Sequence, residues 1–248
     1  MAEEQKFPTE VIDLPSEGRL YPKEHPCSNG KIELKYMTAK EEDILTSANL
    51  IKKGVVIDRL LSSLIMTPNV KIDELFLGDK NAIMIASRVL AYGPEYICSV
   101  QDPSNGETIE HKFNLADCPF KKLPKDVKEN NFEFKLPISK KKITFKILTS
   151  GEEKTLENEI NSSKKIGVDI SPDQTTRLRH IITSIDGDSS REAINSLAIN
   201  MLARDSLSLR HEFQRISPDI EMKQNVDFGG NVVEVDILLT TEFFWPTS

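Results

Sequence analysis

Apolar and polar residues alternate in two short stretches of the chain, KIELKYMTAKEE at residues 31–42 and KITFKILTSGEE at residues 142–153. Alternation with a period of two is typical of a strand. In each stretch a threonine follows the apolar residues and a glutamate comes three positions later, which is the spacing of a helix capping box. The pairs are Thr38 with Glu41 and Thr149 with Glu152. Each stretch therefore predicts a strand that runs directly into a helix, and the second stretch is a diverged copy of the first.

The elements predicted after the two copies follow the same order. Apolar residues recur at helical spacing in three segments after each strand, and an alternating stretch with a central turn closes each copy. In the first copy the helices cover residues 39–49, 55–66 and 80–91, and the hairpin covers residues 95–113. In the second copy they cover residues 151–163, 172–184 and 191–203, and the hairpin covers residues 220–240. A helix over residues 206–216 has no counterpart. We therefore predict an α+β fold with two diverged strand–helix–helix–helix–hairpin repeats, over residues 31–115 and 142–248.

The chain outside the two repeats is predicted to be extended or irregular. Prolines punctuate residues 1–30, and because proline fixes φ and lacks an amide donor, we predict an extended N-terminal arm there. The apolar residues of this arm are Phe7, Val11, Leu14, Leu20 and Tyr21. The arm either drapes over its own domain or docks on a partner. Residues 116–141 are predicted to form a linker and an edge strand, because residues 132–136 alternate.

Composition indicates an ordinary soluble chain with an acidic balance. Of the 248 residues, 38% are hydrophobic and 29% are charged, and the net charge is −7. The sequence has no apolar run of the ~18 residues that a membrane span requires. The N-terminus has no apolar signal core, so we expect a cytoplasmic location. The negative net charge argues against broad binding to nucleic acid.

A lysine cluster is the local exception to this acidic balance. It comprises Lys135, Lys140, Lys141, Lys142 and Lys146. A solvated strand face is a better interpretation of these residues than a phosphate site, given the charge of the whole chain.

Residues that could catalyse a reaction or bind a metal are few and scattered. The three cysteines, Cys27, Cys98 and Cys118, form no CxxC pair, so Cys98, His111 and Cys118 would offer at best three zinc ligands. We expect no zinc and no other cofactor. No phosphate-binding glycine pattern and no nucleophile motif is present, and the four histidines lie in different predicted elements. The paired glutamates of the two capping boxes are explained by the helix dipole. We therefore expect a protein that is not an enzyme and takes no small-molecule substrate.

Binding of partner proteins is then the remaining kind of function, and it requires exposed surfaces that can contact them. Aromatic residues at a chain end either plug the core or anchor an interface, and the strand predicted before the aromatic tail favours closure of the core. The residues that we would test first for partner binding come from the arm, the first strand and the tail. They are Leu14, Leu20, Tyr21, Tyr36, Phe243, Phe244 and Trp245.

Several stretches give the chain a family resemblance. They are LPSEG at residues 14–18, Tyr21-Pro22, His25-Pro26, KYMTAKEEDILT at residues 35–46, NLIKKG at residues 49–54, ARDS at residues 203–206, SPDI at residues 217–220 and FFWP at residues 243–246. With them the chain resembles the T4-type phage baseplate hub family, whose members are hub subunits or hub assembly proteins. The resemblance implies a non-enzymatic protein that binds other baseplate hub or tail assembly proteins. It also implies a place in the host cytoplasm during assembly. The protein then either stays in the tail baseplate of the virion or acts only as an assembly factor.

The resemblance does not extend to a metal site. Some relatives carry Cys-x-x-Cys-Gly at the two hairpin turns, in the manner of a zinc-ribbon-like module. This chain departs from that pattern, because only Cys98 lies near the first turn and Phe228-Gly229-Gly230 occupies the place of the second. Zinc binding is therefore not carried over. The alternative function is a nucleic-acid-associated module with a degenerate zinc-ribbon-like hairpin, which would use the lysine cluster.

Overall fold

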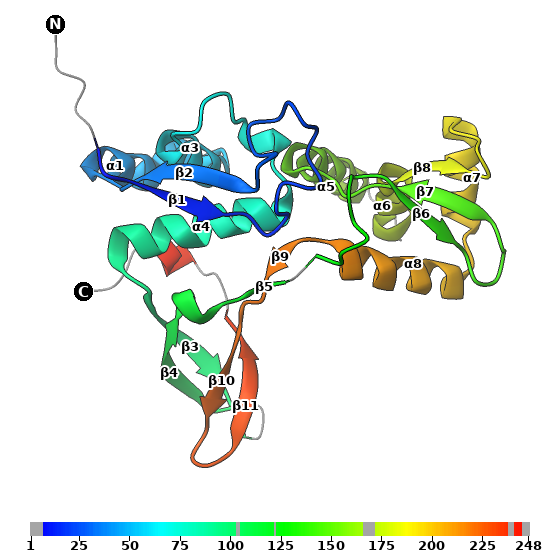
Figure 1. Ribbon diagram of the computed structural model, residues 1–248. Helices are drawn as coiled ribbons and strands as arrows, with labels where there is room; N and C mark the ends of the chain where they lie inside the picture. Colours follow the sequence, from blue (N-terminus) through cyan, green and yellow to red (C-terminus); the bar gives the residue numbers. More distant parts are fainter. Residues whose placement is uncertain (1–6, 103–104, 122, 166–171, 238–240, 245–248) are drawn as a thin grey trace, which may run out of the picture.

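The structure, a computed structural model, describes residues 7–102, 105–121, 123–165, 172–237 and 241–244. These residues form eight α-helices and five small antiparallel sheets, so the predicted α+β class is confirmed. Figure 1 shows the elements up to α4 on one side of the molecule and those from β6 to α8 on the other. We refer to β1–β4 with their helices as the first half, and to β6–β11 with their helices as the second half.

The first half is built on a two-stranded sheet to which the N-terminal arm contributes. β1 (Thr9–Asp13) pairs with β2 (Lys31–Lys35), and Ile12 lies opposite Ile32. The sequence prediction missed β1. The nearest prolines, Pro8 and Pro15, flank this strand, so its own amides remain free to pair. The helices of this half are α1 (Ala39–Thr46), α2 (Ala48–Lys52), α3 (Val56–Leu64) and α4 (Leu77–Tyr92), with a 3₁₀ helix η1 (Ile72–Glu74) before α4.

The second half carries a three-stranded sheet in the order β6–β7–β8. Its strands are β6 (Phe132–Lys135), β7 (Lys142–Phe145) and β8 (Ile182–Ile185), and its helices are α5 (Ser150–Lys165), α6 (Asp173–Ile181), α7 (Arg191–Asn200) and α8 (Ala203–Ile216). The predicted edge strand at residues 132–136 is confirmed as β6. The predicted helix over residues 172–184 is wrong at its end. Its last residues are rich in β-branched side chains and pair with β7 as β8.

Two hairpins lie side by side at one end of the molecule (Figure 1). The first is β3 (Glu95–Gln101) with β4 (Thr108–Asn114), and the second is β10 (Lys223–Asp227) with β11 (Val232–Asp236). The Gln224 side chain joins them, because it accepts a hydrogen bond from the Asn114 amide and donates one to the Asn114 carbonyl. A short pair, β5 (Phe120–Lys121) with β9 (Asp219–Ile220), connects the region before β6 to the end of α8.

The larger of two hydrophobic core clusters runs through both halves, so they form a single body. It contains Ile32 and Leu34 of β2 together with Ile143 and Phe145 of β7. At the junction, the Ser150 amide donates to the Leu75 carbonyl and the Ser150 hydroxyl donates to the Ile72 carbonyl. Backbones also approach closely there: a Cβ on Gly78 would lie 1.9 Å from the Pro218 carbonyl oxygen. Close backbone approach of this kind requires glycine.

Candidate functional site

Five of the seven residues predicted to bind partners are buried in the protein's own core. Leu14, Leu20 and Tyr21 of the arm are buried, and so are Phe243 and Phe244 of the aromatic tail. Tyr36 is half-buried, and Trp245 lies outside the described residues. The described part of the arm therefore packs on its own domain, and the described part of the tail closes a core. A contact between any of these residues and a partner stays a prediction.

A buried carboxylate, Asp79, holds the arm against α4. Asp79 Oδ1 accepts a hydrogen bond from the Ser16 amide at 2.9 Å, and its Oδ2 accepts one from the Tyr21 hydroxyl at 2.7 Å. The same hydroxyl accepts a bond from the Phe76 amide at 3.2 Å, and the Tyr21 ring stacks on His25. Burial raises the pKa of Asp79, although the bonds from Ser16 and Tyr21 oppose that rise. The Asp79 carboxylate and the Tyr21 hydroxyl are both paired within the fold, so this contact is structural.

A buried arginine, Arg88, holds the C-terminal segment against the other end of α4. Its guanidinium donates to three backbone carbonyls, those of Phe243 at 2.8 Å, Gly93 at 3.0 Å and Glu95 at 3.1 Å. Burial lowers the pKa of Arg88, and no carboxylate pairs with it among the described residues. The Phe243 ring also packs edge-on against Tyr96 of β3. Arg88 therefore connects α4, the first hairpin and the 3₁₀ helix η3 (Thr241–Phe244).

The capping box predicted after β2 is present and is extended by a buried lysine. Glu41 Oε2 accepts from the Thr38 amide at 3.0 Å and from the Thr38 hydroxyl at 2.6 Å. Glu41 Oε1 accepts from Lys35 Nζ at 2.8 Å and from the Ser63 hydroxyl at 2.7 Å. Burial opposes ionisation of Glu41, but the bonds from Lys35, Thr38 and Ser63 outweigh it and lower the pKa of Glu41 to about 2.

The capping box predicted after β7 shares the threonine-amide bond and the lysine bond of the first, in a more exposed setting. Glu152 Oε2 accepts from the Thr149 amide at 3.0 Å, the Glu152 amide donates to the Thr149 hydroxyl at 3.4 Å, and Lys146 pairs with Glu152. The Glu152 side chain is 39% exposed, whereas that of Glu41 is fully buried. The lysine–threonine–glutamate arrangement therefore occurs at both strand-to-helix turns.

The lowered pKa of Glu41 predicts that the free energy of unfolding falls in acid. Its pKa is depressed in the folded chain, so its contribution is present above the unfolded pKa of ~4.3 and is lost as the pH falls toward 2. We expect the free energy of unfolding of the wild type to fall by about 2–3 kcal/mol more than that of Glu41→Gln between about pH 6 and about pH 2.5. Urea titrations at both pH values measure this difference.

The control for this experiment is Glu152→Gln, at the more exposed turn. Between the two pH values, the free energy of unfolding of Glu152→Gln should change by an amount within about 1 kcal/mol of the wild-type change. The reason is that exposed ion pairs contribute little to stability. Parallel pH curves for the wild type and Glu41→Gln would contradict the prediction.

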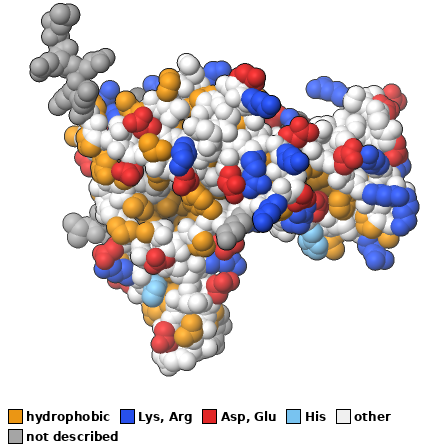
Figure 2. All heavy atoms as spheres, viewed as in Figure 1, with side chains coloured by type: hydrophobic (Ala, Val, Ile, Leu, Met, Phe, Trp, Pro, Cys, Tyr) orange, Lys and Arg blue, Asp and Glu red, His pale blue; other side chains and the backbone are white. Residues whose placement is uncertain are grey.

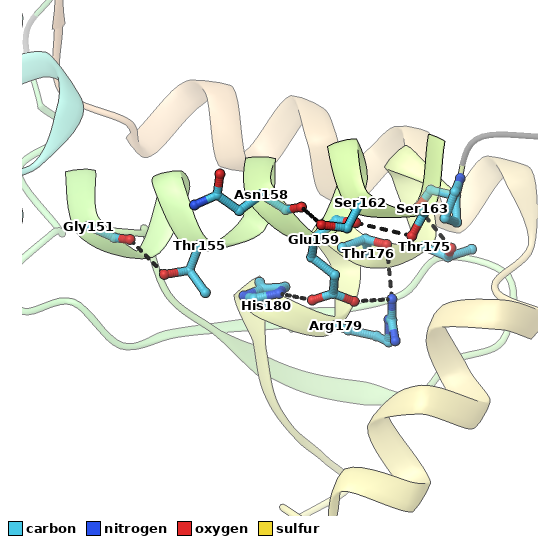
Figure 3. Close-up of polar contacts among 11 residues, drawn as sticks. Gly151, Thr155, Asn158, Glu159, Ser162, Ser163, Thr175, Thr176, Arg179 and His180 are labelled. Carbon is cyan, nitrogen blue, oxygen red and sulfur yellow. Dashed lines mark hydrogen bonds and ion pairs between the residues drawn. The ribbon is translucent and has the colours of Figure 1, made fainter. Parts of the chain in front are cut away.

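A polar cluster joins α5 to α6. Glu159 accepts from Arg179 at 2.8 Å and bonds to His180 at 2.9 Å, and Figure 3 shows both side chains reaching the same carboxylate. Arg179 also donates to the Thr176 hydroxyl at 2.9 Å. The hydrogen bond from His180 is the largest cause of the lowered pKa of Glu159. These bonds join the two helices.

The residues considered as zinc ligands have other neighbours. Cys98 lies opposite His111 in the β3–β4 ladder, and Cys118 contacts the Gln224 amide. Burial raises the pKa of both thiols, which disfavours the thiolates that zinc requires. Within the described ranges, no three His, Cys, Asp or Glu side chains gather closely enough to hold a metal ion.

The lysine cluster divides into paired and unpaired members. Lys142 pairs with Glu133, and Lys146 pairs with Glu152. Lys135, Lys140 and Lys141 are exposed at the end of the β6–β7 ribbon and have no ion pair with any residue that the structure describes. Figure 2 shows Lys and Arg side chains over this end of the molecule, interspersed with acidic ones. On the face that Figure 2 shows, the mixture forms no continuous basic groove for a nucleic-acid backbone.

The sequence alone did not single out Asp79, Arg88 or Asp205. Asp79 and Arg88 sit on a helix whose other residues are mostly apolar, and such charges are buried only when they are paired. That contrast is the signal by which both could have been found. Asp205 is buried at the start of α8, where its carboxylate accepts from the Ile138 amide at 2.7 Å and the Ser139 amide at 3.0 Å.

Comparison with known proteins identifies one family. The family model described as T4 bacteriophage base plate protein matches residues 8–135, just over half of the chain. The matched region runs from β1 to β6 and includes Glu41, Asp79 and Arg88. No curated protein and no solved structure matches the chain. Among the described residues, none of the helices has the length and apolar character needed to cross a membrane.

Proposed function

Because the chain belongs to the T4 bacteriophage base plate protein family, we propose that it is a structural or assembly protein of the baseplate hub. It acts by binding other baseplate hub or tail assembly proteins, and it is not an enzyme. The family match over residues 8–135 is the observation that supports this proposal most strongly. It covers most of the arm, the first half and the sheet strand that begins the second half, so the family relationship concerns the folded body and not a single motif.

The state of the polar residues supports a binding role. Asp79, Arg88 and Glu41 each hold backbone or side-chain groups of the same chain, and Glu159 is held by His180 and Arg179. Strongly perturbed pKa values in this protein thus accompany structural pairing. The protein would meet its partners in the host cytoplasm during assembly, and as a structural component it would remain with them in the tail baseplate.

We also propose that the two halves are diverged copies of one unit. The support is a set of matching bonds. Lys35–Thr38–Glu41 and Lys146–Thr149–Glu152 are equivalent at the turns after β2 and β7. Asp79 is the third residue of α4 and accepts an amide from the β1–β2 connection, and Asp205 is the third residue of α8 and accepts two from the β6–β7 turn.

This set of bonds supports an alignment of the copies that differs from the one predicted from the sequence. The sequence paired the helix over residues 80–91 with that over residues 191–203. The two aspartates instead favour pairing α4 with α8, each followed by a hairpin. The inserted helix is then α7.

Incorporation during infection tests the proposed function. An affinity-tagged chain is expressed in infected cells, and its partners are identified by mass spectrometry in tail intermediates and in finished particles. We expect it with hub proteins in intermediates. Presence in finished particles as well identifies a structural component, and presence only in intermediates identifies an assembly factor. Absence of the chain from both fractions, with normal expression, would overturn the proposal.

A further inference from the structure

The strand β1 lies at the edge of the sheet in the first half. On one side it pairs with β2, and β2 is bridged on its far side to the chain after α3, where the Glu33 carbonyl accepts from the Met66 amide at 2.8 Å. No strand that the structure describes pairs with the other side of β1 (Figure 1). An unpaired strand edge of this kind is a template on which another strand can pair.

The backbone groups on the open edge of β1 belong to Thr9, Val11 and Asp13. The ladder with β2 fixes this assignment, because the Tyr36 amide of the β2 side donates to the Pro8 carbonyl. Alternate residues of an antiparallel strand bond to the same neighbour, so the even-numbered residues bond to β2 and the odd-numbered residues face outward. The outward amides and carbonyls have no hydrogen-bond partner among the residues that the structure describes.

The side chains along this edge are also exposed. Most residues of β1 are exposed on the surface, and Val11 is 56% exposed. Phe7, two residues before the strand, is 38% exposed. The other apolar residues of the arm are buried in the core. The arm therefore presents apolar side chains and unpaired backbone groups at the same place.

A second copy of the chain fits this edge in an antiparallel register with Val11 opposite the same residue of the other copy. Thr9 then lies opposite Asp13, so all the outward residues of both strands are used, and each bonded pair exchanges both of its hydrogen bonds. The side chains suit this register, because the Thr9 hydroxyl faces the Asp13 carboxylate and Glu10 faces Ile12. No two like charges lie directly opposite each other.

Neighbouring registers, and another open edge, are less favourable for pairing of two copies. A shift by two residues in one direction places Glu10 opposite Glu10, and a shift in the other direction brings in Pro15, which has no amide to donate. The strand β11 pairs only with β10 among the described strands and carries an exposed valine, Val232. The symmetric register of β11 is centred on Glu234, however, and sets two carboxylates opposite each other.

We propose that two copies of this chain associate through β1 and form a continuous sheet in the order β2–β1–β1–β2. The copies are related by a twofold axis, which is the commonest symmetry among protein oligomers and uses the same surface on both copies. The contact is small, so the dimer is reversible and forms as the protein concentration rises. This inference goes beyond the proposed function and does not depend on it.

Proline substitution at the strand edge tests the pairing in the full-length chain. We expect a monomer–dimer equilibrium for the wild type in sedimentation equilibrium. Val11→Pro removes an amide that points away from β2, so the β1–β2 ladder keeps its bonds while the bonds between the two Val11 residues are lost. The dissociation constant of the dimer should rise at least about tenfold. Val232→Pro is the matched control, because it removes an outward amide at an exposed valine of β11, and it should leave that constant unchanged.

Cysteine cross-linking tests the register independently. The Cα atoms of a bonded antiparallel pair lie about 5.5 Å apart, which is within the span of a disulfide. Val11→Cys should therefore form a covalent dimer when it is oxidised with diamide. Val232→Cys, at a similarly exposed position, and the wild type should form far less covalent dimer under the same conditions. Retained folding of each variant is checked by its ¹⁵N spectrum.

The outcomes separate this inference from the proposed function. A wild type that is monomeric at every concentration, a dimer that is unaffected by Val11→Pro, or equal cross-linking of Val11→Cys and Val232→Cys would overturn the pairing. A monomeric chain whose β1 amides become protected only when another tail protein is added would also overturn it, because the occupant would then be a partner protein. A dimer with the expected pattern supports the pairing, and absence of the chain from tail fractions would overturn only the hub assignment.

Discussion

Arg88→Leu is expected to lower the free energy of unfolding by about 3–5 kcal/mol. The Arg88 guanidinium is the donor to the carbonyls of Phe243, Gly93 and Glu95. Leucine fills part of the space but donates nothing, so three carbonyl acceptors around a buried position lose their partner. The cost therefore exceeds that of an ordinary core truncation of similar size.

Urea denaturation measures this effect, and two further variants make it specific. Arg88→Lys retains a cation but lacks the planar fork that reaches three acceptors, so we expect a loss of about half as much. Arg59→Leu, an exposed position on α3, should change stability by less than about 0.5 kcal/mol. An Arg88→Leu loss no larger than that of Arg59→Leu would contradict the role of Arg88.

Release of the chain's C-terminal segment is a second consequence of the Arg88→Leu change. Because Arg88 Nε holds the Phe243 carbonyl, its removal should expose residues after α4 and β11 to protease before the body unfolds. Limited proteolysis with mass spectrometry reads this out directly. We expect cleavage within residues 241–244 to come first in Arg88→Leu, and no such preference in the wild type.

Local signals in the sequence predicted most of the secondary structure. The two threonine–glutamate pairs are both capping boxes, and the hairpin at residues 95–113 is formed as predicted. The errors have long-range causes. β1 forms as a strand because it pairs with β2. In the same way, β8 forms because it pairs with β7, although the spacing of Ile182 and Ile185 fits a helix equally well.

The candidate site was harder to predict than the fold. The sequence identifies apolar anchors in the proline-rich arm, namely Leu14, Leu20 and Tyr21. It does not determine whether the core of the same chain or a partner protein covers them. The answer depends on Asp79, which is 58 residues from Tyr21 and binds its hydroxyl.

Gly78→Ala is expected to destabilise the protein by about 3–4 kcal/mol, although alanine is the better helix former. A methyl group on Gly78 would lie 1.9 Å from the Pro218 carbonyl oxygen and 2.9 Å from the Asp219 Cα atom. Both neighbours are backbone atoms, so no side-chain rotation relieves the contact. The start of α4 and β9 must separate, and with them the junction between the two halves.

The direction of the change in stability caused by Gly78→Ala distinguishes a tightly packed glycine from an ordinary helical one. In an open helical position, replacing glycine with alanine stabilises a protein by up to about 1 kcal/mol.

Gly151→Ala provides a graded comparison, because its Cβ would lie 2.8 Å from the Asp73 Cβ and 3.0 Å from the Asp73 carbonyl oxygen. We expect a smaller loss there, of about 1–2 kcal/mol. Leu77→Ala, at a neighbouring exposed position, should cost less than about 1 kcal/mol. If Gly78→Ala were neutral or stabilising in urea denaturation, α4 and β9 could not be packed as closely as the structure places them, and the junction would be a loose contact between two separately stable halves.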